Sequence, residues 1–140
     1  NDTGREFRAL SVRVPVLLTP GIGHNFISKW RSSIVNSRSV TIFNGDGLFN
    51  SCVWAEDIFD FFSEFRSNEK TLNLTCNVGA EKSISIAQAL KVLADGLGRR
   101  AKVVNVPSNR PSQYYDCTLA KRHGYRPGSV ESSLEKFAKT

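Results

Sequence analysis

The sequence predicts a mixed α/β domain, because short apolar runs typical of strands alternate along the chain with segments whose apolar residues recur at helical spacing. The chain has 140 residues, of which 40% are hydrophobic and 10% aromatic, enough to fill the core of one domain. Its first apolar run, 9–18, is too continuous for a strand with one face in water. We therefore expect a strand there that is buried on both faces, in a sheet of parallel strands covered by helices.

The next elements follow from caps and turn residues. Asn25 is a suitable N-cap for a helix that ends near residue 36 and carries Phe26, Trp30 and Ile34 on one face. Strands are expected at 40–43 and at about 51–54. Between them lies Asn44-Gly45-Asp46-Gly47, a strong turn signal because Asn and Gly tolerate positive φ.

From residue 56 onward, the sequence predicts three more helices, one helical turn and two strands. A helix over 57–65 begins with the acids Glu56 and Asp57 at its positive end and buries Ile58, Phe61, Phe62 and Phe65. Ser85 and Gln88 form a capping box for a helix that stops at Gly98. The remaining expected elements are strands over 71–76 and 102–106, one helical turn over 118–122, and a final helix marked by Val130, Leu134 and Phe137.

Charge and composition limit the kinds of partner that we expect the chain to bind. The net charge is +6, but the basic residues are scattered and no stripe is interleaved with aromatics, so we expect no nucleic-acid partner and instead an anionic small ligand. No apolar run approaches the ~18 residues of a membrane span, so we expect no membrane partner. Three cysteines, odd in number and far apart, indicate buried reduced thiols in a cytoplasmic protein. The chain contains no Met, from which we expect a fragment of a longer protein.

No self-sufficient catalytic or metal-binding set is found. Gly45-Asp46-Gly47 is followed by Asn50 and a strand, so it is not a dinucleotide-binding loop, and no phosphate-loop lysine is present. The two histidines, His24 and His123, are isolated from other ligand residues. None of the three tyrosines has a lysine four residues later to lower the pKa of its phenol.

Six motifs that occur in order along the chain indicate a particular protein family, which composition alone does not. They are Arg13-Val-Pro-Val-Leu-Leu-Thr-Pro-Gly21, Asn25-Phe26-Ile27, Val40-Thr-Ile-Phe-Asn-Gly-Asp-Gly47, Val53-Trp-Ala-Glu-Asp-Ile58, Thr71-Leu-Asn-Leu74, and Arg110-Pro111 with Asp116. Together, from about residue 9 to 138, the chain resembles the C-terminal part of an extended short-chain dehydrogenase/reductase of the NAD-dependent epimerase/dehydratase family, which contains UDP-galactose 4-epimerase.

The resemblance implies the C-terminal portion of a Rossmann-type fold, with residues 1–140 as a nucleotide-sugar-binding lobe that carries the last Rossmann strands. The glycine-rich cofactor loop and the Tyr-x-x-x-Lys pair of the family lie upstream of this segment and are absent from the chain. The parent is then an isomerase-type enzyme that uses NAD or NADP, whereas this fragment alone binds no cofactor and is inactive. Because members often dimerise through helices that precede this segment, a homodimer of the parent is expected.

The resemblance also implies a set of substrate-binding residues. Asn25 and Phe26 match a helix head that contacts the sugar-nucleotide phosphates, a natural anion site, although Asn25 also fits a plain N-cap. Thr41 and Phe43 match a strand that embraces the base, although a core strand looks the same. Arg110 matches the arginine that binds the pyrophosphate, with a solvated loop residue as the alternative.

Three departures from the family pattern weaken the assignment of one substrate. The arginine that commonly follows the Gly-Asp-Gly turn is missing, and Asn50 is nearest to its position. Gln113 stands where an acid is often found, and Val16 where many members carry asparagine. A non-catalytic nucleotide- or protein-binding module on the same fold is therefore the alternative function.

Overall fold

The computed structural model describes residues 7–68, 70, 73–112 and 114–140. Its strands are β1 (Ala9–Arg13), β2 (Val16–Leu18), β3 (Ser39–Phe43), β4 (Leu48–Phe49), β5 (Cys52–Trp54), β6 (Asn73–Asn77), β7 (Ile84–Ser85) and β8 (Lys102–Val106). Its helices are α1 (Phe26–Val35), α2 (Ala55–Ser67), α3 (Ile86–Gly96), α4 (Thr118–Arg122) and α5 (Val130–Ala138). The predicted α/β class and the order of the helices are confirmed.

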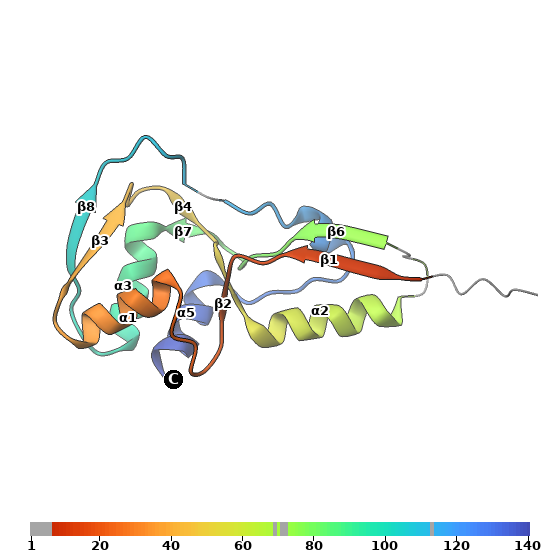
Figure 1. Ribbon diagram of the computed structural model, residues 1–140, viewed down its shortest axis with the longest axis horizontal. Helices are drawn as coiled ribbons and strands as arrows, with labels where there is room; N and C mark the ends of the chain where they lie inside the picture. Colours follow the sequence, from red (N-terminus) through yellow and green to blue (C-terminus); the bar gives the residue numbers. More distant parts are fainter. Residues whose placement is uncertain (1–6, 69, 71–72, 113) are drawn as a thin grey trace, which may run out of the picture.

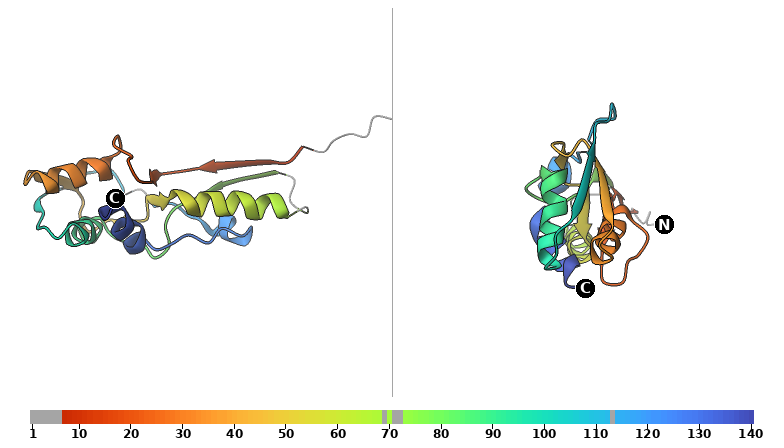
Figure 2. Two further views of the ribbon diagram at one scale, coloured as in Figure 1. Left: turned by 90° about the horizontal axis from the view of Figure 1, so that it is seen from below. Right: turned by 90° about the vertical axis from the view of Figure 1, so that its left-hand side faces the viewer.

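The strands of the described chain pair two by two. Three pairs are parallel, β1 with β6, β2 with β5 and β3 with β8, and the short β4 and β7 pair antiparallel. Figure 1 shows an elongated molecule in which α2, β1 and β6 form one end and α1, α3, β3 and β8 the other. Figure 2 shows β1 and β6 side by side along one flank of α2.

Two hydrophobic clusters correspond to these two ends. The larger lies among α1, α3, α5, β3 and β5, where Leu18, Ile27, Leu90 and Leu134 are fully buried. The smaller lies between α2 and β6, around Phe61 and the fully buried Tyr125. Each fully buried Leu or Phe contributes about 1.5–3 kcal/mol, so both clusters stabilise the fold.

Helix ends follow the predicted chemistry. The side chains of Asn25 and Ser85 accept hydrogen bonds from the backbone N–H groups of Ser28 and Gln88, as expected for N-caps. Gly98 has φ 64° just after α3, the left-handed conformation that a helix-ending glycine supplies. The C-terminus of α2 is held by a residue far away in sequence: Arg8 donates hydrogen bonds to the carbonyls of Phe65, Arg66 and Asn68.

Two packing predictions are wrong. The run 9–18 is not one strand buried on both faces, because it breaks between β1 and β2 at Val14-Pro15 and β1 alternates exposed and half-buried residues. Proline has no N–H to donate to a strand ladder, and β1 pairs only with β6 among the described residues. Phe62 is also 40% exposed, since it lies at the margin of the apolar stripe of α2, beside Arg8 and Leu10 in a shallow cleft.

The other boundaries differ by a few residues. The strand expected at 71–76 is observed as Asn73–Asn77, and Thr71 and Leu72 lie outside the described residues. The two-residue strands β4 and β7 were not predicted. All three cysteines are buried and unpaired by disulfides, as expected. Within the described chain, every helix is too short or too polar to cross a lipid bilayer.

Candidate functional site

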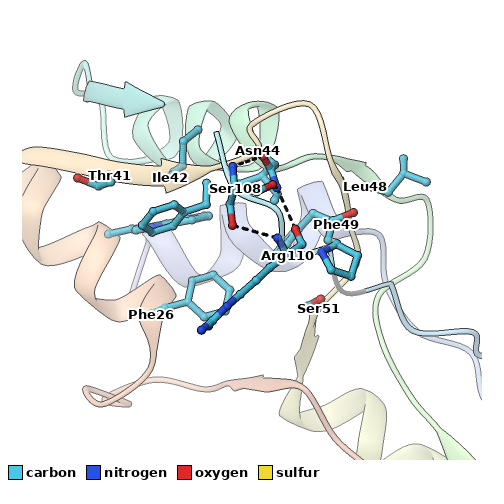
Figure 3. A pocket seen from close by; sticks show the side chains of 14 residues that line it. Phe26, Thr41, Ile42, Asn44, Leu48, Phe49, Ser51, Ser108 and Arg110 are labelled. Atoms are coloured by element: carbon cyan, nitrogen blue, oxygen red, sulfur yellow. Dashed lines mark hydrogen bonds between the residues drawn. The ribbon is translucent and has the colours of Figure 1, made fainter. Parts of the chain in front are cut away.

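A groove of about 580 Å³ lies where β3 and β8 end. Because these strands are parallel, their carboxyl ends meet, and open α/β folds bind ligands at such an edge. The groove takes its walls from α1, β3, the turn after β3 and the segment after β8 (Figure 3). Its lining residues are Phe26, Trp30, Thr41, Ile42, Phe43, Asn44, Leu48, Phe49, Ser51, Ile86, Ser108, Arg110, Pro111 and Ser112.

One wall of the groove is aromatic. The ring of Phe26 lies edge-on to Trp30, with 5.1 Å between ring centroids, and edge-on to Phe49 at 6.1 Å. Phe49 is buried, whereas Phe26 and Phe43 are 39% and 55% exposed and present their rings to the solvent. Such a wall suits a flat, largely apolar part of a ligand.

The groove contains one cationic side chain and no carboxylate among its described lining residues. This is Arg110, whose side chain extends across the groove toward Phe26 in Figure 3. Within the described chain, Arg110 forms no ion pair; the ion pairs found there join Lys91 to Asp95 and Lys121 to Glu81. A guanidinium without an internal counter-charge is suited to an anionic group on a ligand.

The backbone around Arg110 is held by a residue that the sequence identified only as part of a turn. The Asn44 side-chain Oδ1 accepts a hydrogen bond from the Ser108 N–H at 2.8 Å. Its Nδ2 donates to the carbonyls of Ser108 at 2.8 Å and of Arg110 at 3.0 Å. In the sequence, the one sign that Asn44 matters structurally is its place in the Asn44-Gly45-Asp46-Gly47 turn. In the structure it adopts φ 49°, a left-handed conformation typical of such turns.

The structure brings four of the six predicted site residues together in the groove: Phe26, Thr41, Phe43 and Arg110. Asn25 does not line it; the Asn25 side-chain Oδ1 caps α1 by accepting from the Ser28 N–H at 2.8 Å. The Asn25 Nδ2 is buried and has no hydrogen-bond partner among the described residues.

Asn50 also lies outside the groove. It is 3% exposed, and its amide bonds the backbone of Tyr115, donating to the carbonyl at 2.8 Å and accepting from the N–H at 2.9 Å. Of the two other departures from the family pattern, Val16 is half-buried against the larger core and Gln113 lies outside the described residues.

A second, smaller cleft of about 220 Å³ is lined by Asn50 and Cys117 among other residues. Burial raises the pKa of the Cys117 thiol to about 11, so it stays protonated at neutral pH and lacks the thiolate that a nucleophile requires. Tyr125 is fully buried, and its hydroxyl donates to the Gly79 carbonyl at 2.8 Å, which is a structural role. No three His, Cys, Asp or Glu side chains in the described ranges gather as a metal site.

No protein-family model matches the chain. In sequence it is similar to trichodiene synthase of Fusarium sporotrichioides, 29% identical over 110 residues that make up 75% of this chain and 29% of that protein. The chain thus spans less than a third of that relative, and this match shows neither a family nor an activity.

Solved structures resemble the chain over nearly its whole length. Among them are dTDP-glucose 4,6-dehydratase of Bacillus anthracis in complex with NAD (TM-score 0.71, 11% identity, 93% of this chain, 43% of that one) and UDP-glucose 4-epimerase of Thermotoga maritima with UDP-glucose (0.68, 18%, 93%, 44%). A third is the enzyme WbmG of Bordetella bronchiseptica in complex with NAD and UDP (0.74, 14%, 93%, 43%).

The chain shares the Rossmann-type α/β fold of part of these enzyme structures. This confirms the predicted fold class. At these identities the likeness concerns the fold alone, and the chain spans less than half the length of each of these enzymes.

Proposed function

We propose that the chain is the C-terminal, substrate-binding lobe of an NAD(P)-dependent nucleotide-sugar epimerase or dehydratase, and that its groove binds the nucleotide diphosphate. The observation that carries the proposal is the groove itself, in which one unpaired guanidinium faces an aromatic wall at the carboxyl ends of two parallel strands. Support comes from the shared fold, since similar structures were solved with UDP or UDP-glucose.

Each groove residue has a task that its chemistry suits. Arg110 forms charge-assisted hydrogen bonds with the pyrophosphate. Phe43 and Phe26 contact the base and its surroundings through their exposed rings. Thr41 lies beside Phe43 on the exposed face of β3. Asn25 does not line the groove, but Phe26, the first residue of α1, does, so the partial positive charge of the helix N-terminus lies at the groove's edge.

The rest of the proposed enzyme lies outside this chain. In the parent, a nicotinamide cofactor oxidises the sugar transiently, while the residues of this lobe bind and orient the nucleotide. We propose that the parent is a cytoplasmic homodimer and that this lobe alone holds no cofactor and no catalytic residue.

One observation favours the second candidate, a non-catalytic nucleotide- or protein-binding module. The family's second arginine is replaced by Asn50, whose amide bonds Tyr115, so Arg110 is the one cation among the described residues of the groove. The loss of this phosphate contact departs from the pattern of the family's enzymes, and the same fold can carry functions without turnover.

Substitution of Arg110 tests the proposal. Arg110 is exposed, so Arg110→Ala should leave folding intact. A charged hydrogen bond contributes about 1.5–3 kcal/mol, and its loss should weaken binding of UDP and UDP-glucose by about tenfold to a hundredfold. Isothermal titration calorimetry of the 140-residue chain measures this.

Arg100→Ala is the matched control, because Arg100 is also exposed but lies outside the groove and the change removes the same charge. If both variants weaken binding equally, the attraction is only that of net charge. Absence of UDP binding by the unmodified chain, or an unchanged affinity of Arg110→Ala, would refute the assignment of the groove.

A further inference from the structure

Asn44 and Asn50 lie before and after β4, and each bonds the backbone of the segment that follows β8. Asn44 bonds the backbone of Ser108 and Arg110 through three hydrogen bonds of 2.8–3.0 Å. Asn50, six residues later, bonds both the N–H and the carbonyl of Tyr115. Each side-chain amide both donates to and accepts from backbone groups that are 64–66 residues away in sequence.

These bonds bracket the part of the chain that lines the groove. Ser108, Arg110, Pro111 and Ser112 all face it. The Arg110 N–H donates to the Ser108 Oγ at 3.2 Å, so the bonds from Asn44 to Ser108 also restrain Arg110. The described residues of this segment are thereby attached at two places: Ser108 and Arg110, which line the groove, to Asn44, and Tyr115, which follows the groove-lining residues, to the buried Asn50.

We propose that Asn44 and Asn50 are positioning residues that hold this segment so that Arg110 faces the groove, and that Asn50 acts in this way rather than as a ligand contact. The proposal rests on the function proposed above for the groove. Its physical basis is preorganisation: a loop held in its bound conformation before the ligand arrives loses less conformational entropy on binding. The effect of either asparagine on affinity therefore passes through Arg110.

Asn44→Gly is the sharpest variant. Asn44 has φ 49°, where alanine would strain the backbone, whereas glycine adopts this conformation freely and removes only the side-chain bonds. Ser37→Gly is its matched control, because Ser37 is exposed, has φ 56° and lies outside the groove. Any effect of placing glycine at a left-handed position is shared by the two variants.

A double-mutant cycle with UDP separates positioning from a general loss of structure. We expect Asn44→Gly to weaken UDP binding by about threefold to tenfold when Arg110 is present and by less than about twofold in the Arg110→Ala background. Ser37→Gly should change neither affinity. Weakening by the same factor in both backgrounds, or no weakening at all while Arg110→Ala still weakens binding, would overturn the positioning role and leave the proposed function standing.

Amide hydrogen exchange tests the same proposal without a ligand. Asn44→Gly should speed exchange of the Ser108 N–H by at least about tenfold and leave that of Tyr115 unchanged, because Asn50 still accepts from the Tyr115 N–H. Unchanged protection of Ser108 would overturn the proposal even if UDP did not bind. An unchanged UDP affinity of Arg110→Ala would instead remove the proposed function.

Discussion

Gly47 controls how closely the Arg110 segment approaches the turn after β3. A Cβ placed on Gly47 would lie 2.8 Å from the Ser112 Cβ and 3.1 Å from the Asn44 carbonyl oxygen. Both neighbours belong to or adjoin the backbone, so neither can rotate away without moving the chain. Gly47→Ala must therefore push the groove-lining segment and the turn apart.

The cost follows from overpacking. Forcing an extra methyl group into a filled space destabilises a protein by about 1–3 kcal/mol, partly offset by the ~0.4–1 kcal/mol that alanine contributes by restricting the unfolded chain. Gly23→Ala is the matched control, because its Cβ would meet no atom within 4 Å and only the stabilising effect applies. We therefore expect the free energies of unfolding of the two variants to differ by about 1–3 kcal/mol.

The assay is thermal unfolding followed by circular dichroism, with UDP titration of the same samples. For a domain of this length, 1 kcal/mol corresponds to about 3 °C, so the Tm of Gly47→Ala should lie roughly 3–9 °C below that of Gly23→Ala. UDP affinity should fall in Gly47→Ala only. Equal Tm values would show that the segment near Ser112 does not pack on Gly47, and unchanged UDP affinity would show that this contact does not shape the groove.

Two further predictions concern buried polar groups. Tyr125→Phe leaves the Gly79 carbonyl without its 2.8 Å hydrogen bond, so the free energy of unfolding measured in urea should fall by about 1–3 kcal/mol. Tyr114→Phe is the control at an exposed position and should change the free energy of unfolding by less than about 0.5 kcal/mol. Equal effects of the two variants would contradict a structural role of the Tyr125 hydroxyl. Burial raises the pKa of the Cys52 thiol from 9.0 to about 12. As the pH rises, the unfolded chain therefore loses this proton before the folded chain does. The protonated thiol's contribution to stability is complete below pH 9 and is lost between about pH 9 and 12. At pH 10.5 the loss from Cys52 is roughly 2 kcal/mol, and Cys52→Ala should show a correspondingly weaker alkaline destabilisation in urea titrations; an unchanged pH dependence would exclude Cys52 as its source.

Local chemistry made much of the fold predictable. Asn25 and Ser85 were identified as caps because a short polar side chain before an apolar helical repeat satisfies the first backbone N–H groups. The strand at Lys102–Val106 and the turn at Asn44 followed equally from residue types within a few positions. Burial was less predictable: Phe62 fits the apolar spacing of α2, yet its side chain is 40% exposed in the cleft beside Arg8 and Leu10.

The sequence by itself determined the helices, most of the longer strands and their order. Through a family resemblance it also indicated Phe26, Thr41, Phe43 and Arg110 as candidates for one site. Only the tertiary structure decided that these side chains share a groove, because parallel pairing of β3 with β8 joins segments about sixty residues apart. It also decided the partners of Asn44 and Asn50. From its neighbouring sequence, an asparagine can be predicted only as a turn residue or a phosphate ligand. Its actual hydrogen-bond partner depends on which distant backbone groups the fold places within hydrogen-bonding distance.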